Sequence, residues 1–94
     1  MRYIESHVHK SQVGVLLELD VGADSATESE EFRQLAHDLV LHIAGCKPKS
    51  PGELLEQPFI RDPEQLVSHR LYVVSTLLQT QIRVTRFVRY DATA

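Results

Sequence analysis

The sequence contains a single cysteine, Cys46, and no tryptophan. One cysteine excludes an internal disulfide framework and a cysteine-rich zinc site, and it fits a reducing compartment. No apolar run approaches the roughly 20 residues that a membrane helix requires, and the opening segment MRYIESHVHK has no apolar stretch of the kind found in signal peptides. These absences predict a cytoplasmic protein that has no membrane partner.

The chain also lacks a basic excess. Its 10 Lys and Arg residues against 13 Asp and Glu residues give a net charge of −3, which disfavours generic binding to nucleic-acid phosphates. We therefore expect no direct nucleic-acid partner. The charge is uneven, since residues 18–31 hold six acids and no base whereas residues 83–89 hold three arginines.

The length of 94 residues suits one domain, residues 1–94, and not two. A domain of this size buries only roughly 60–65% of the surface that its unfolded chain exposes, so it is marginally able to stand alone. Association with a second copy is a common remedy, and a homodimer is therefore expected.

Three segments are predicted to be strands. Residues 2–9 alternate in polarity, and residues 13–21 place five apolar side chains on one face at a period of two. The polar turn at residues 10–12 would join these two strands as a hairpin. Residues 81–90, QIRVTRFVRY, are rich in β-branched and aromatic side chains and form the third predicted strand.

Two segments are predicted to be long helices. Ser29 is a suitable N-cap, apolar residues recur at helical spacing through residues 30–44, and Gly45 is a suitable terminator. Asp62 is expected to cap a second helix that has the following proline at its first position. The apolar stripe of this second helix extends to Leu78.

The order ββααβ predicts an α+β fold, with a three-stranded antiparallel sheet and the helices packed on one of its faces. The other face carries Leu16 and would be covered only by a second copy or another partner. Candidate residues for a dimer interface are Leu16, Phe87 and Arg89. Strict alternation along the third strand would place Arg86 opposite Arg83 and Arg89, and we expect these arginines to form ion pairs with the acidic second strand.

Two groups of side chains could carry chemistry but are better explained as ordinary surface or core residues. His7 and His9 share a strand face at a spacing that can hold a metal, yet spacing fixes no third ligand. His37, Asp38 and Cys46 could suggest a base and a nucleophile, but a glycine interrupts the helix before the cysteine. We expect no metal, no cofactor and no enzymatic activity.

Three stretches taken together resemble a known family. Residues 13–44, 54–63 and 82–91 resemble, in order and spacing, the core or dimerisation domain of elongation factor Ts, the guanine-nucleotide exchange factor of elongation factor Tu. The matching residues are Gly14, Val15, Leu16, Glu18, Leu19, Glu30, Glu31, Phe32, Asp38, His42, Ile43, Ala44, Gln57, Pro58, Phe59, Asp62, Arg86, Phe87, Val88 and Arg89.

The resemblance implies a GTPase partner and a surface that faces it. In the family, the loop after the second strand carries a Thr-Asp-Phe segment whose Asp and Phe contact the GTPase near its nucleotide and Mg²⁺ site. The aligned residues here are Ala23, Asp24 and Ser25, so the acid is present and the aromatic wedge is absent. The residues assigned to this GTPase-facing site are Val21, Gly22, Ala23, Asp24, Ser25 and His42.

The sequence also departs from the family pattern. The family usually begins with a small helical domain that docks on the GTPase, and many members carry a helical insertion after the first core helix. We expect this sequence to lack both, with KPKSPG, residues 47–52, closing the gap. Two hypotheses follow, namely a minimal factor that promotes GDP release and a binding or dimerisation module that has lost exchange activity.

Overall fold

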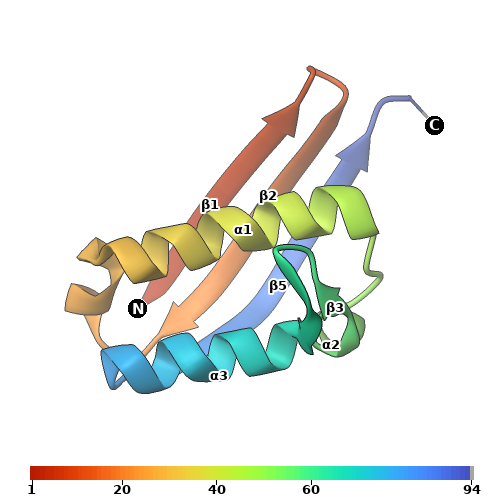
Figure 1. The fold of residues 1–94 in the computed structure, drawn as a ribbon. Helices are drawn as coiled ribbons and strands as arrows, with labels where there is room; N and C mark the ends of the chain where they lie inside the picture. The colour runs from red at the N-terminus through yellow and green to blue at the C-terminus, as the bar shows by residue number, and fades with distance from the viewer. Residues whose placement is uncertain (94) are drawn as a thin grey trace.

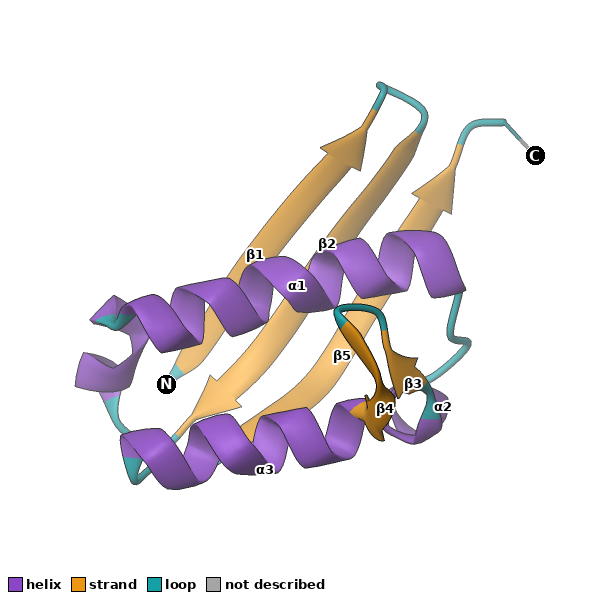
Figure 2. Cartoon of the chain, viewed as in Figure 1, coloured by secondary structure: helices purple, strands orange, loops and turns teal. Residues whose placement is uncertain are grey.

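Two layers make up the structure, a sheet and the helices that cover one of its faces (Figure 1). The computed structural model describes residues 1–93. The elements are β1 (Arg2–His9), β2 (Val13–Val21), η1 (Asp24–Glu28), α1 (Glu30–Cys46), α2 (Pro51–Glu56), β3 (Pro58–Phe59), β4 (Asp62–Leu66), α3 (Val67–Leu78) and β5 (Ile82–Asp91). The antiparallel sheet has the order β1-β2-β5, and α1 and α3 lie across the same face of it (Figure 2). The predicted α+β architecture is confirmed.

Helix α1 begins where the sequence predicts. The Oγ of Ser29 accepts a hydrogen bond from the N–H of Phe32 at 3.1 Å, and two glutamates follow in the first turn, where they favour the positive end of the helix dipole. The helix continues through Gly45, because Lys47 takes the left-handed C-cap conformation with a φ of 55°. The prediction that Gly45 ends the helix is therefore wrong.

The second long helix, α3, begins later than predicted. Residues Asp62–Leu66 pair with Pro58–Phe59 as the hairpin β3–β4, and the helix starts at Val67 without a side-chain cap. The carboxylate of Asp62 accepts a hydrogen bond from Nε2 of Gln65 at 2.7 Å within the hairpin. The prediction that Asp62 caps this helix is wrong, because pairing with an earlier segment uses the backbone that the helix would have needed.

The side chains of β2 alternate between two environments. Val15, Leu17 and Leu19 are buried against the helices and form much of the core. Leu16 and Glu18 lie on the opposite face, which is called the outer face below.

No helix within residues 1–93 is long and apolar enough to cross a membrane.

A β-bulge in β5 decides which arginines share a face. Two consecutive residues of β2 pair with Val84 and Arg86, so Thr85 is an extra residue between them. The bulge reverses the alternation, and Arg83 and Arg86 consequently both lie on the outer face with their acidic partners, whereas Arg89 lies on the helix-covered face. The prediction that Arg86 opposes Arg83 is wrong for this reason.

Candidate partner-binding surfaces

The loop that the resemblance assigns to a GTPase joins β2 to α1 and contains the short 3₁₀ turn η1. Asp24 and Ser25 are exposed, and 82% of the Asp24 side chain is accessible to solvent. Val21 is fully buried in the core, and Ala23 is half-buried. The loop therefore exposes two polar residues, Asp24 and Ser25, which are called the polar corner below, and it is anchored in the core by Val21.

Gly22 fixes the base of this loop against the turn that precedes β5. Its N–H donates to the carbonyl of Gln81 at 2.9 Å. A Cβ added to Gly22 would lie 2.8 Å from Oγ1 of Thr80, closer than ordinary contacts allow. The ammonium group of Met1 lies 4.0 Å from the carboxylate of Asp24 on the other side of the loop. Neighbouring elements thus hold the backbone while the polar corner stays accessible.

His42 does not lie on this surface. It is fully buried near the far end of α1, roughly 18 Å along the helix from its first residue at 1.5 Å per residue. The N–H of Ile60 donates to its Nδ1 at 3.1 Å, so Nε2 carries the proton and donates to Oε1 of Gln57 at 2.8 Å. The assignment of His42 to the GTPase-facing site is corrected, because His42 fastens the β3–β4 hairpin to α1.

The outer face of the sheet is apolar at its centre, and none of the helices in residues 1–93 covers it. Leu16, on the central strand, is 51% exposed. Together with Ile4 and Val88 it lines a shallow hollow of about 300 Å³. Val8 and Tyr90 extend the exposed apolar surface along the flanking strands.

A buried carboxylate lies beside this apolar surface. Glu18 is 8% exposed and accepts hydrogen bonds from Oγ1 of Thr85 at 2.7 Å, Nη1 of Arg2 at 2.8 Å and Nη2 of Arg86 at 3.2 Å. The Thr85 hydroxyl and the Arg86 guanidinium lower the pKa of Glu18 to about 2, although burial opposes this. Arg83 forms a further ion pair with β2. The predicted ion pairs between β5 and β2 are therefore present for Arg83, which pairs with Asp20, and for Arg86, which pairs with Glu18.

Phe87 and Arg89 lie on the helix-covered side of the sheet. Phe87 pairs with Leu17 and packs against the core. Nε of Arg89 donates to the carbonyl of Ala44 in the last turn of α1 at 3.1 Å, where a cation favours the negative end of the helix dipole. The predicted interface set of Leu16, Phe87 and Arg89 therefore does not form one surface, and Leu16 alone belongs to the outer face.

The side chains that could carry chemistry are dispersed. The rings of His7 and His9 have centroids 6.0 Å apart, but no group of three or more metal-ligating side chains occurs in the part of the chain that the structure describes. Asp38 is buried and accepts hydrogen bonds from Nε of Arg61 and Nε2 of Gln34, each at 2.8 Å. Its carboxylate is engaged with these two partners and not with a histidine.

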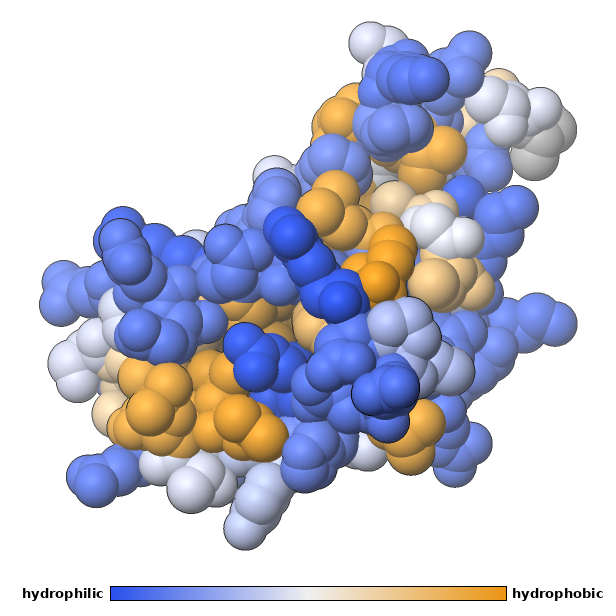
Figure 3. Space-filling view, in the orientation of Figure 1, coloured by the Kyte–Doolittle hydropathy of each residue, from blue (hydrophilic) through white to orange (hydrophobic). Residues whose placement is uncertain are grey.

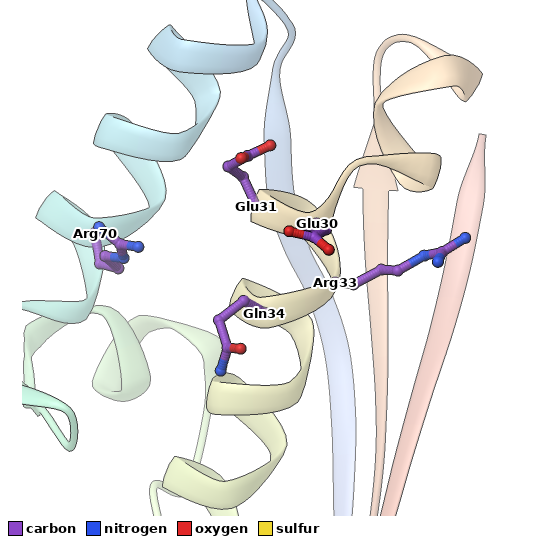
Figure 4. A pocket seen from close by; sticks show the side chains of 5 residues that line it. All are labelled: Glu30, Glu31, Arg33, Gln34 and Arg70. Carbon is purple, nitrogen blue, oxygen red and sulfur yellow. The ribbon is translucent and has the colours of Figure 1, made fainter.

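A groove of about 600 Å³ lies between α1 and α3 (Figure 4). Glu30, Glu31 and Gln34 line it from α1 and Arg70 lines it from α3, whereas the side chain of Arg33 points away from α3. Because charges of opposite sign line one open groove, it favours neither an anion nor a cation.

Comparison with known proteins places these surfaces in context. Over 94% of its length the chain is 25% identical to elongation factor Ts of Acetivibrio thermocellus and 28% identical to that of Thermodesulfovibrio yellowstonii. The identity to elongation factor Ts of Rubrobacter xylanophilus is 27% over the same share. The chain is similar to elongation factor Ts. No protein-family profile matches it.

The chain spans less than two thirds of the first two of these relatives, 62% and 66% of their lengths, and 69% of the third. The matches extend over 132 to 134 positions, although the chain has 94 residues. The elongation factor Ts proteins therefore carry residues within the matched region that this chain lacks.

Proposed function

We propose that the chain binds elongation factor Tu through the loop of residues 21–28 and promotes release of GDP, as an exchange factor in the cytoplasm and not as an enzyme. The observation that carries this proposal is the exposed corner of Asp24 and Ser25 on a backbone fixed by Gly22. The resemblance to elongation factor Ts assigns the exchange loop to these residues. By thermodynamic linkage, a protein that lowers the affinity of a GTPase for GDP by some factor must bind the GDP-loaded GTPase more weakly by the same factor.

A second candidate function rests on Ser25. An aromatic side chain buries roughly 150 Å² or more and can separate packed elements, and a serine hydroxymethyl group cannot. Ser25 is exposed, and it stands where the family has the aromatic residue. This observation favours a module that binds the GTPase without loosening its nucleotide.

The test is the release of a fluorescent GDP analogue from elongation factor Tu while the chain is titrated and its binding is followed in parallel. Faster release that is lost in Asp24→Asn and retained in Glu28→Gln supports exchange, because Glu28 is an exposed acid of the same turn. Binding without faster release, together with a gain of release in Ser25→Phe, supports the module. If the chain does not bind elongation factor Tu, both candidate functions are wrong.

We also propose that two copies associate through the outer face. The support is the uncovered apolar surface around Leu16 on a domain of marginal size. Leu16→Glu is expected to shift the mass measured by light scattering from dimer to monomer. Leu77→Glu is the matched control, because Leu77 is similarly exposed but lies on α3. A mass that changes equally in both variants, or in neither, would place the interface elsewhere.

A further inference from the structure

An apolar groove lies between α3 and the first residues of β5. It has a volume of about 410 Å³, and its lining includes Leu55 from α2, Leu71 and Tyr72 from α3, and Ile82 and Val84 from β5. Figure 3 shows hydrophobic residues gathered over α3, the helix that forms one wall. β5 is an edge strand, because it pairs only with β2 among the described residues. The groove therefore lies beside a sheet edge of the kind to which an extended chain can add as a further strand.

The backbone of β5 presents unpaired groups along this edge. The N–H of Val21 donates to the carbonyl of Met1 at 2.8 Å, so the backbone of Val21 is directed away from β5. Ile82 pairs with Val21, and Val84 pairs with Leu19 two residues away, so both belong to pairs that exchange no ladder hydrogen bonds with β2. Their N–H and C=O groups consequently point to the free edge, and within residues 1–93 no turn, loop or side-chain hydrogen bond reaches them.

Arginine side chains lie along the outer face of the same strand. Solvent reaches 63% of the Arg83 side chain and 78% of the Arg86 side chain. Arg83 pairs with Asp20 at 3.4 Å and Arg86 with Glu18 at 3.2 Å, both on the β2 side. A guanidinium carries several N–H donors, so each arginine retains donors for a carboxylate on the other side of β5. An added strand is therefore favoured when its outer side chains are acidic.

Strand β2 shows which side-chain pattern suits β5. Its residues Glu18 and Asp20 bind the arginines on the outer face, whereas Leu19 and Val21 are fully buried on the helix-covered face. The sequence Glu-Leu-Asp-Val thus matches both faces of β5, with acids outside and apolar side chains inside. The β5 strand of a second copy would not match, because its arginines would lie against like charges. The charges therefore favour a different protein as the occupant of this edge.

We propose that the free edge of β5 binds an extended segment of a partner protein in which acidic and apolar side chains alternate. The N–H and C=O groups of Ile82 and Val84 bond to the backbone of this segment. One of its apolar side chains enters the groove beside α3, and one of its acids lies beside Arg83. The inference is independent of the exchange activity and of the association of two copies proposed above.

The test is an NMR titration of the whole chain with the capped peptide Gly-Glu-Leu-Asp-Val-Gly and with its basic counterpart, Gly-Lys-Leu-Lys-Val-Gly. We expect saturable shifts of the amide signals of Ile82 and Val84, with the acidic peptide binding about ten-fold more tightly, since the change to lysine replaces attraction by repulsion at two positions. Arg83→Glu is expected to remove this preference, whereas Arg33→Glu, at an exposed position on α1, leaves it unchanged. Equal affinity of both peptides for the wild-type chain, or no saturable shifts at β5, would overturn the proposal.

N-methylated forms of the acidic peptide test whether the segment pairs through its backbone. Residues directly opposite each other on paired strands have side chains on the same face, so the Leu and Val of the peptide lie opposite Ile82 and Val84 and supply the hydrogen bonds. N-methylation of the Leu and Val is therefore expected to abolish the shifts. N-methylation of the Glu and Asp, whose N–H groups point away from β5, is the matched control and leaves the shifts in place. Equal binding of the two methylated peptides would contradict strand addition at this edge.

Discussion

Replacing His42 by leucine tests whether the buried hydrogen bonds hold the β3–β4 hairpin. The side chain is fully buried, and leucine of similar size keeps most of the packing against Phe59. The replacement leaves the N–H of Ile60 without its acceptor and Gln57 without its donor. An unsatisfied group costs about 1–3 kcal/mol and a lost neutral hydrogen bond about 1 kcal/mol, so we expect a loss of about 3 kcal/mol.

That loss is large for a domain of this length, whose total stability is about 5–14 kcal/mol at 0.05–0.15 kcal/mol per residue. With a urea m-value of about 1 kcal/mol/M, the unfolding midpoint should fall by about 3 M at fixed protein concentration. His37→Leu, on the exposed face of the same helix, should change stability by less than about 0.5 kcal/mol. A His42→Leu midpoint as close to the wild type as that of the control would refute this reasoning.

Two further predictions concern the sheet and the loop. The pKa of Glu18 is about 2 in the folded protein against an ordinary 4.5. The ionised carboxylate therefore stabilises the fold fully above about pH 4.5, and this contribution is lost as the pH falls toward 2. Between these pH values the urea midpoint of Glu18→Gln should fall less steeply than that of the wild type, and an equally steep fall would contradict the role of the carboxylate. Gly22→Ala should lower stability by about 1 kcal/mol, because its Cβ would meet Oγ1 of Thr80; the additional change Thr80→Ala should recover the loss in thermal melts, and a failure to recover it would exclude that contact as the cause.

Local signals predicted β1, β2, β5 and the start of α1 correctly. The alternation of residues 13–21 separated the buried leucines from Leu16, and Ser29 marked the start of α1 through a cap that acts over three residues. These features depend on neighbours in the sequence, so the sequence is sufficient to identify them. The polar corner at Asp24 and Ser25 was predicted through the resemblance, and the structure shows it to be exposed.

Other features depended on contacts between distant segments. The bulge at Thr85 exists because β5 pairs with β2 in a shifted register, and no local pattern along β5 predicts it. The β3–β4 hairpin likewise replaced a helix start that Asp62 and Pro63 would favour. His42 was assigned to the wrong surface because its partners, Gln57 and Ile60, are 15 and 18 residues away.

The sequence by itself determined the order of the three long strands and the two long helices, and the inner and outer sides of β2, because each of these follows from polarity and propensity over a few residues. Only the tertiary structure decided which arginines surround Glu18 and what His42 holds. The physical reason is that hydrogen bonds and packing between distant segments compete with local preferences, and in a domain with so small a core they decide the result.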